Sequence, residues 1–334
     1  MMRAPDPAER GGRAVALRLF IVGCPRSGTT ILQRGAAARF GLYTLPETRF
    51  YAHLVGNFER KAFAAERRRR PPRLALTTEL RERLRLGTGL QWSHVEFGPR
   101  HESRKWRSFG SESRVFLEML DDRAREAGMR GWVEKTPDHV HYLDHIFRLA
   151  PSARVIHVLR EARDVVASIR DAARRYDKPW GATFPNIERA VDRWNKSVAD
   201  SARWCADEER NLFLRYEDFA VDAESVYDRI GRFLGVAPVS EEVGATPTRI
   251  AAEGERWKSA ALSGPIAPAD SKWDTALDKT ERAQAEALIA PLPAALERRL
   301  GPKVACAESP APGPISAAAG AGREMMARDE ATRT

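Results

Sequence analysis

The chain has 334 residues, of which 43% are hydrophobic and 30% are charged. This composition is typical of a globular protein and excludes a fibrous or fully disordered chain. The chain contains no stretch approaching the roughly 20 consecutive apolar residues that a membrane-spanning helix needs, and its first residues lack the apolar core of a secretory signal. We therefore expect a cytoplasmic protein without a transmembrane segment.

The two ends of the chain differ in composition from its middle. Residues 1–16 are polar with Pro and Gly, and residues 305–334 combine Ala, Pro, Gly and charged residues without an apolar period. Segments of this kind bury too little apolar surface to offset the loss of chain entropy on folding. We predict disorder at both ends and a single domain over residues 17–304.

The net charge of +9 indicates a kind of binding partner only if the excess of basic residues is concentrated in one part of the chain. Much of the excess lies between residues 59 and 130, which include the run Arg67–Arg70. A solvated helix end is the first interpretation of this run. A nucleic-acid surface would require interleaved aromatic residues or a binding motif, which this stretch lacks. We expect no nucleic-acid partner, while contact with an anionic acceptor or a membrane surface stays open.

Metal-ligating side chains are sparse and poorly spaced. The three cysteines are too few and too far apart for a disulfide framework or a zinc site. Among His139, His141 and His145, only the last two would share a helix face. No further ligand pair accompanies them, so we expect no metal.

The predicted elements begin with a strand over residues 15–22, an apolar run typical of a buried parallel strand. A loop with two glycines follows and leads into a helical stretch, in which Gly35 stands beside three alanines without an evident reason. Residues 48–130 are mostly helical in pattern, with an amphipathic helix over 111–127. We expect 48–130 to be a helical insertion over the sheet.

Short apolar strands alternate with helices through the rest of the chain. This alternation predicts an α/β, P-loop-type fold with three layers, in which helices flank a central parallel sheet. Ligands bind such sheets at the carboxyl ends of the strands. The predicted strands are 131–134, 153–159 and 211–215, and the predicted helices are 137–149, one from about 163, 186–207 and 223–234.

The loop from Gly23 to Thr30 reads GCPRSGTT, which is the spacing of a phosphate-binding loop. Its glycines let backbone N–H groups approach an anion at a helix N-terminus. Thr29, however, stands where a nucleotide triphosphatase has its lysine. This difference weakens the alternative hypothesis, a P-loop nucleotide-dependent kinase. Such a kinase would also need an aspartate for Mg²⁺ after a strand, at the place where this chain has Arg160.

Four stretches together resemble the sulfotransferases that use 3′-phosphoadenosine 5′-phosphosulfate (PAPS). They are CPRSGTT in the loop, EKTP at 134–137, RVIHVLREARDVVASI from Arg154, and LRYEDF at 214–219, and they follow the order of that family over residues 17–275. The resemblance implies transfer of a sulfuryl group from PAPS to a hydroxyl, or less readily an amine, without a metal. The acceptor is not readable and is expected to be a small metabolite, lipid or sugar.

PAPS carries two separate anionic ends, so its binding needs two anion sites. The resemblance assigns the 3′-phosphate to Arg160 and Ser168. Eight residues of helix separate them, about two turns, so they can face one pocket, and a guanidinium with a hydroxyl suits a phosphate. Ala162 replaces the proline that the family commonly has here, which should shift the start of the helix. The resemblance assigns the 5′-phosphosulfate to Arg26, Ser27, Gly28, Thr29 and Thr30.

The catalytic roles are also implied by the resemblance. Glu47, in Pro-Glu-Thr-Arg, is similar to the glutamate base of the tyrosylprotein branch, and His53 is the alternative base. A carboxylate can take the acceptor's proton if its pocket raises its pKa toward the working pH. Arg26 takes the place of the loop cation, and Lys135 of EKTP fills a second catalytic position beside the developing charge.

Two further residues come from a late segment that resembles the family's cofactor-closing loop. In Trp257-Lys258-Ser259 the resemblance implies that Ser259 contacts the sulfuryl end. In Ser271-Lys272-Trp273 it implies that Lys272 contacts the 5′-phosphosulfate.

Overall fold

The computed structural model describes residues 17–55, 109–176, 180–239 and 271–303, together with 250, 251, 255, 258, 262 and 263. The predicted disordered ends and the Arg67–Arg70 run lie outside these residues. Of the expected insertion, residues 56–108 also lie outside them. No helix within the described part of the chain is long and apolar enough to cross a bilayer.

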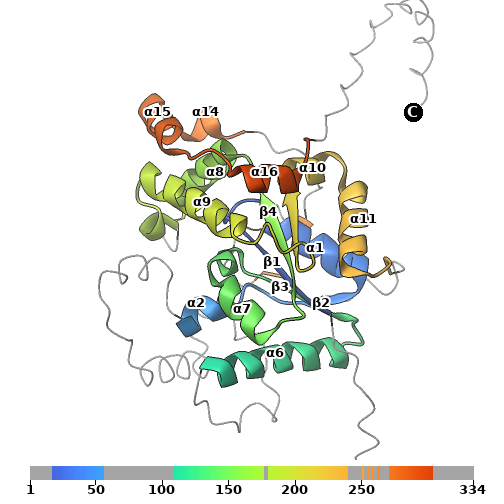
Figure 1. Ribbon diagram of the computed structural model, residues 1–334. Helices are drawn as coiled ribbons and strands as arrows, with labels where there is room; N and C mark the ends of the chain where they lie inside the picture. The colour runs from blue at the N-terminus through green and yellow to red at the C-terminus, as the bar shows by residue number, and fades with distance from the viewer. Residues whose placement is uncertain are drawn as a thin grey trace, which may run out of the picture. The chain divides into compact units, whose positions relative to one another are not determined.

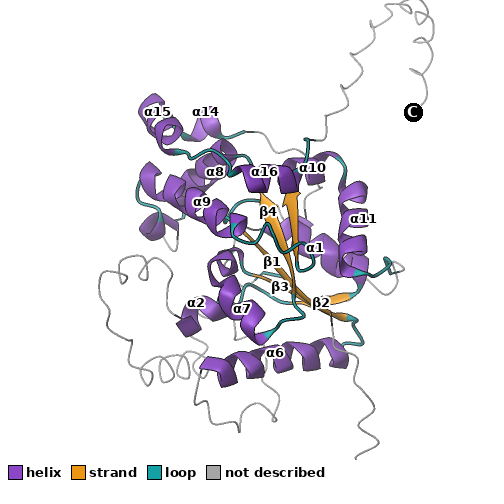
Figure 2. Cartoon of the chain, viewed as in Figure 1, coloured by secondary structure: helices purple, strands orange, loops and turns teal. Residues whose placement is uncertain are grey.

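The centre of the fold is a parallel sheet of five strands in the order β2-β3-β1-β4-β5, drawn in orange in Figure 2. Every pair of neighbouring strands is parallel. The P-loop-type α/β fold predicted from the sequence is confirmed. The strands are β1 (Leu17–Gly23), β2 (Leu42–Thr44), β3 (Gly131–Lys135), β4 (Arg154–Leu159) and β5 (Asn211–Arg215).

Side chains of β1 alternate between two hydrophobic cores. Phe20 and Val22 belong to the core that contains Trp132 and helix α6 (Phe109–Glu126). Leu19 and Ile21 point to the other face and pack in the core that contains α1 (Thr29–Phe40) and α11 (Ala223–Leu234). Because both faces are covered, the central strand is continuously apolar from Leu19 to Val22 rather than alternating with polar residues.

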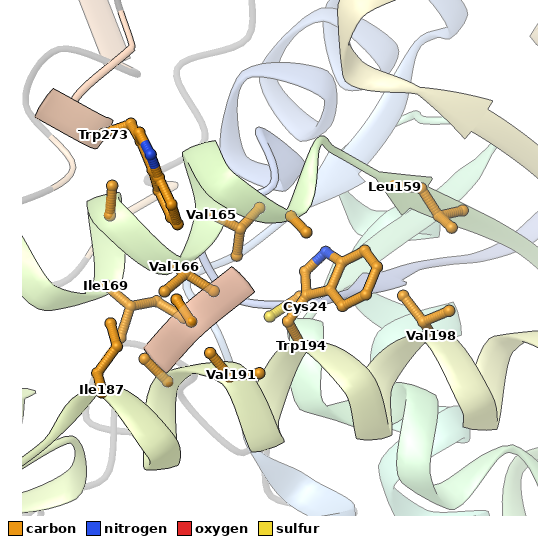
Figure 3. Packing of buried hydrophobic residues seen from close by; sticks show 14 of the residues in the cluster. Cys24, Leu159, Val165, Val166, Ile169, Ile187, Val191, Trp194, Val198 and Trp273 are labelled. Atoms are coloured by element: carbon orange, nitrogen blue, oxygen red, sulfur yellow. The ribbon is translucent and has the colours of Figure 1, made fainter. Parts of the chain in front are cut away.

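A third core lies between helices beyond the sheet, at the side of β4. It holds Cys24, at the end of β1, against helices α8 and α9, as Figure 3 shows with Val165, Val166, Val191 and Trp194. Cys24 is 4% exposed, so the start of the loop is anchored by apolar packing. The helices of this core are α8 (Ala162–Arg175), α9 (Ile187–Ala202), α14 (Trp273–Ala276), α15 (Lys279–Leu288) and α16 (Ala294–Leu300).

Several predicted bounds hold and several are wrong. The strand 211–215 and the helix 223–234, which ends at the left-handed Gly235, are confirmed. The predicted helix 137–149 is instead a 3-10 helix, η3 (Pro137–Tyr142), followed by α7 (Leu143–Leu149), because Pro137 begins a short tight turn. The helix expected to reach residue 207 ends at Ala202.

Some elements were not predicted. They are β2, α10 (Tyr216–Val221) and the C-terminal helices α14, α15 and α16, which can be found in Figure 1. Helix α2 (Phe50–Val55) falls in the segment that was predicted to be mostly helical, although its bounds were not predicted. Within the expected insertion, the amphipathic helix is confirmed as α6, two residues earlier than its predicted start.

The structure explains Gly35. A Cβ at this position would lie 1.6 Å from the hydroxyl of Tyr227 on α11. The bare backbone of α1 therefore gives room for a tyrosine, and this contact is one that spacing along the sequence cannot reveal.

Candidate functional site

The predicted site residues lie where a parallel sheet presents its carboxyl edge. The loop after β1 lies between the end of β3, which carries Lys135, and the end of β4, which precedes Arg160, because β1 is the strand between β3 and β4. Residues more than 100 positions apart in the sequence are brought together in this way.

The loop backbone requires both of its glycines. Gly28 has φ 87°, and a Cβ there would lie 2.2 Å from the Tyr216 ring. A Cβ on Gly23, with φ 152°, would lie 2.4 Å from the carbonyl oxygen of Val158. Arg26 also has a positive φ, 75°. Helix α1 starts directly after Gly28, so the positive end of its dipole faces the loop.

Arg26 connects the loop to the residues assigned to the 3′-phosphate. Its Nε donates to Ser168 Oγ at 3.1 Å, and Arg160 Nη1 donates to its carbonyl oxygen at 3.4 Å. The Trp180 ring lies 5.6 Å from its guanidinium. Burial, and then the charge of Arg160, lower the pKa of Arg26. We call Arg26, Arg160 and Ser168 the arginine group.

Arg160 has two further neighbours. Its Nη2 contacts Asp164 at 3.4 Å, one helical turn away, and its guanidinium lies 4.6 Å from the Tyr216 ring centre. Asp164 also accepts from Ser271 Oγ at 2.8 Å. The carboxylate therefore joins the arginine group to the segment that leads into α14.

Glu47 lies on the other side of the loop, against two ammonium groups. Lys135 Nζ is 2.5 Å, and Lys258 Nζ is 2.9 Å, from the same oxygen, Oε1. Lys135 also donates to Thr30 Oγ1 at 3.0 Å, which ties this side to α1. Lys258 in turn pairs with Glu255 at 2.7 Å. We call Glu47, Lys135, Lys258 and Glu255 the lysine cluster.

The electrostatics of Glu47 are opposite to the sequence-based expectation. Burial by itself would raise the pKa of Glu47, but Lys135 and Lys258 outweigh it and hold the pKa well below its usual range. Burial lowers the pKa of Lys135 to about 8, although the attraction of Glu47 acts in the other direction. Glu47 is therefore a carboxylate and Lys135 titrates just above neutrality.

Glu134 fixes the segment that carries Glu47. Its Oε1 accepts from Thr48 Oγ1 at 2.8 Å and from Thr136 Oγ1 at 2.6 Å, and its Oε2 lies 2.8 Å from His139 Nδ1. His139 Nε2 accepts from the backbone N–H of Tyr51, so Nδ1 carries the proton and donates to Glu134. This fully buried network joins EKTP to Pro-Glu-Thr-Arg.

The other predicted residues differ in how far the structure describes them. Lys272 lies against α8, where its Nζ is 2.5 Å from Asp171. Ser259 and the side chain of His53 lie outside the described residues. Ser27 and Thr29 are buried in the loop.

The three histidines do not converge. His139 contacts Glu134, His141 contacts Asp200 at 2.6 Å, and His145 contacts Arg148. Among the described residues, no group of three or more His, Cys, Asp or Glu side chains is arranged to hold a metal ion.

Sequence reasoning missed Lys258 and Glu255. The stretch Trp257-Lys258-Ser259 was noticed, but only its serine was assigned a role. Lys258 is 211 positions from Glu47, and no spacing rule predicts such a contact. The one local signal in the sequence was a glutamate and a lysine three positions apart, which the structure shows to be a buried pair.

A glycine loop at a helix N-terminus, flanked by buried arginine and lysine beside a carboxylate, defines the class of α/β proteins that bind phosphate- or sulfate-bearing substrates. A match to a family model gives a narrower assignment than this class. The chain belongs to the sulfotransferase family, whose model matches residues 18–241.

The solved structures that match this chain include three sulfotransferases. The sulfotransferase domain of the Synechococcus PCC 7002 olefin synthase is 20% identical to this chain, with a TM-score of 0.44. The match covers 84% of this chain and 92% of that domain. Sulfotransferase STF1 from Mycobacterium tuberculosis H37Rv is 19% identical, with a TM-score of 0.40, and the match covers 70% of this chain and 72% of STF1. Sulfotransferase STF9 from Mycobacterium avium is 17% identical, with a TM-score of 0.42, and the match covers 70% of this chain and 67% of STF9. A search among curated proteins finds no match.

Proposed function

We propose that this sulfotransferase uses PAPS as its donor and transfers the sulfuryl group to a hydroxyl of a small acceptor, in the cytoplasm. The single observation that carries the proposal is the pair of cationic groups on the two sides of one glycine loop. The arginine group lies on the β4 side, and the lysine cluster lies on the β3 side. A donor with two separate anionic ends needs two such groups, whereas a triphosphate needs one continuous cradle.

The donor fits the residues present. A Cβ at Gly23 or Gly28 would clash with the backbone of Val158 or the ring of Tyr216, so the turn that presents the backbone N–H groups of the loop to an anion needs glycine at both positions. Arg160 offers a guanidinium that is 11% exposed beside the Tyr216 ring, suited to the 3′-phosphate. Thr30 and Lys135, which contact each other at 3.0 Å, suit the 5′-phosphosulfate.

The proposed chemistry is a direct in-line transfer. The acceptor oxygen forms a bond to sulfur while the bond from sulfur to the bridging oxygen breaks, and that electron pair stays on the 5′-phosphate of the leaving 3′,5′-bisphosphoadenosine. Glu47 accepts the acceptor's proton. Arg26 and Lys135 stabilise the negative charge that develops on the sulfuryl and bridging oxygens, because fixed cations in a buried site need no reorganisation.

Calorimetric titration with 3′,5′-bisphosphoadenosine tests the donor, with Mg-ATP as the competing ligand. We expect bisphosphoadenosine to bind in the micromolar range and Mg-ATP much more weakly. Arg160→Ala should weaken bisphosphoadenosine roughly 10- to 100-fold, since a hydrogen bond to a charged group contributes about 1.5–3 kcal/mol.

Arg163→Ala is the matched control for this titration. Arg163 lies on α8, three positions after Arg160, pairs with Glu286 and is 56% exposed, so its loss should leave the affinity unchanged. A preference for Mg-ATP, or an Arg160→Ala variant that binds bisphosphoadenosine like the wild type, would contradict the proposed donor and favour a kinase.

A further inference from the structure

The four charged groups of the lysine cluster contact one another and are largely buried. The side chains of Lys135, Lys258 and Glu255 are 0%, 6% and 7% exposed, and Glu47 is 19% exposed. Lys258 Nζ bridges the two carboxylates, at 2.9 Å from Glu47 and 2.7 Å from Glu255. Two ammonium and two carboxylate groups give the cluster no net charge.

Each member of the cluster restrains another. Glu255 and Lys258 are three positions apart, and the backbone N–H of Lys258 donates to the Glu255 carbonyl at 2.9 Å. The ammonium of Lys258 contacts the same Glu47 oxygen that Lys135 contacts. Removal of one partner would take away a charge that its buried neighbour contacts, which is unfavourable.

The inference rests on the proposed function, in which Glu47 accepts the acceptor's proton. We propose that Lys258, held by Glu255, is a positioning residue that keeps Glu47 ionised and aimed, so that proton transfer to Glu47 turns a neutral cluster into one of net charge +1.

The change of charge coincides with the chemical step. When the acceptor oxygen bonds to sulfur, its proton goes to Glu47, and the electron pair of the breaking bond goes to the bridging oxygen. A protonated Glu47 no longer balances Lys135 and Lys258. Their positive charge then acts on the sulfuryl and bridging oxygens at the moment when these become more negative. Proton transfer and stabilisation of the leaving group are thereby coupled through one oxygen of Glu47.

The pH dependence follows from the charges around Glu47. Lys135 and Lys258 hold its pKa down, and Arg26 and Asp138 are further charged groups that interact with it. Burial opposes protonation of Lys258, but Glu47 and Glu255 outweigh burial and raise its pKa. Loss of Lys258 therefore raises the pKa of Glu47, and activity should fall at a higher pH when the solution is acidified.

The test uses a variant that removes the outer pair together, Lys258→Met with Glu255→Gln, because Lys258→Met alone would remove the ammonium group that the buried Glu255 carboxylate contacts. Lys258→Arg retains the charge, and Lys279→Met, at an exposed position of α15, is the matched control. The rate is measured in a single turnover, with radiolabelled PAPS, enzyme in excess, and water or 4-nitrophenol as the acceptor. Bisphosphoadenosine affinity is measured beside it.

We expect the double variant to bind bisphosphoadenosine within about threefold of the wild type and to transfer the label at least about tenfold more slowly. The acid limb of its rate profile should move to higher pH by about one pH unit. Lys258→Arg should restore the position of the limb, and Lys279→Met should match the wild type.

A double variant whose rate and acid limb equal those of the wild type would overturn the inference, as would a Lys258→Arg variant with a displaced limb. A wild type that binds no bisphosphoadenosine and transfers no label contradicts the proposed function instead. The two failures are therefore distinguishable.

Discussion

The two sides of the glycine loop use positive charge in different ways. Within the arginine group, Arg26 donates to the Ser168 hydroxyl and Arg160 donates to the Arg26 backbone carbonyl, while Arg160 also contacts Asp164 and keeps 11% of its side chain exposed. The lysine cluster is an interlocked set in which Lys135 is completely buried. A partly exposed guanidinium suits reversible binding of an anion, whereas a buried ammonium with a shifted pKa suits chemistry. In the proposed function, Arg160 on the β4 side therefore serves binding and the lysine cluster on the β3 side serves transfer, while Arg26 lies between them in the loop.

The largest effect is expected on the β3 side. Lys135→Met removes a buried cation that contacts both Glu47 and Thr30. We expect the single-turnover rate to fall about 10²- to 10³-fold, with bisphosphoadenosine affinity changed less than tenfold in the calorimeter. Equal losses of rate and affinity would show that Lys135 serves binding instead.

A glycine comparison sharpens the role of the loop that separates the two sides. Gly28→Ala introduces a Cβ 2.2 Å from the Tyr216 ring at φ 87°, whereas Gly128→Ala, at φ 67°, meets nothing within 4 Å. We expect Gly128→Ala to lower the free energy of unfolding by about 1 kcal/mol through backbone strain alone. Gly28→Ala should lower it more and abolish bisphosphoadenosine binding, as measured by thermal unfolding and calorimetry. Equal effects at the two positions would refute a tight loop against Tyr216.

Alkaline pH should weaken the lysine side before the arginine side. The pKa of Lys135 is about 8, so its positive charge is lost as the pH rises through 8. We expect the single-turnover rate to decline about tenfold per pH unit above that value, while bisphosphoadenosine affinity declines less because it depends on a guanidinium group rather than on an ammonium group. A rate that stays flat to pH 10 would contradict a catalytic Lys135 ammonium.

The smallest predicted effect concerns stability in acid. His157 lies in β4 between Ser201 and Asn211, and burial lowers its pKa to about 4. The folded protein therefore keeps His157 neutral between about pH 6.5 and 4, where the unfolded chain takes up a proton. Stability should fall as the pH drops through this window, and the slope should lessen in His157→Gln. A slope unaltered by the substitution would assign the acid sensitivity to other groups.

The sequence predicted the features that depend on local pattern. Apolar runs marked β4 and β5 to within one residue, and Gly235 marked the end of α11. The three-residue strand β2 has no readable period, and it was missed. Pro137 predicted the start of a helix but not its 3-10 geometry.

The site was predictable in its motifs and not in its pairings. The loop, EKTP and Arg160 were found because each follows a recognisable strand. Their partners are set by the sheet order, which brings Lys135 to Glu47 and Thr48 to Glu134 across 88 and 86 positions. The raised pKa that would suit Glu47 as a base is absent for the same reason, since Lys135 and Lys258 lower the pKa and only the tertiary structure brings these two lysines to Glu47.

The most direct test compares Arg160→Ala with Glu47→Gln, measuring bisphosphoadenosine affinity and the single-turnover rate for radiolabelled PAPS in both variants. A division of labour between the two sides predicts that Arg160→Ala loses affinity roughly 10- to 100-fold and keeps its rate at saturating PAPS. Glu47→Gln should keep its affinity and lose rate about 10²-fold or more. Both variants losing the same quantity would contradict the division between a binding side and a transfer side.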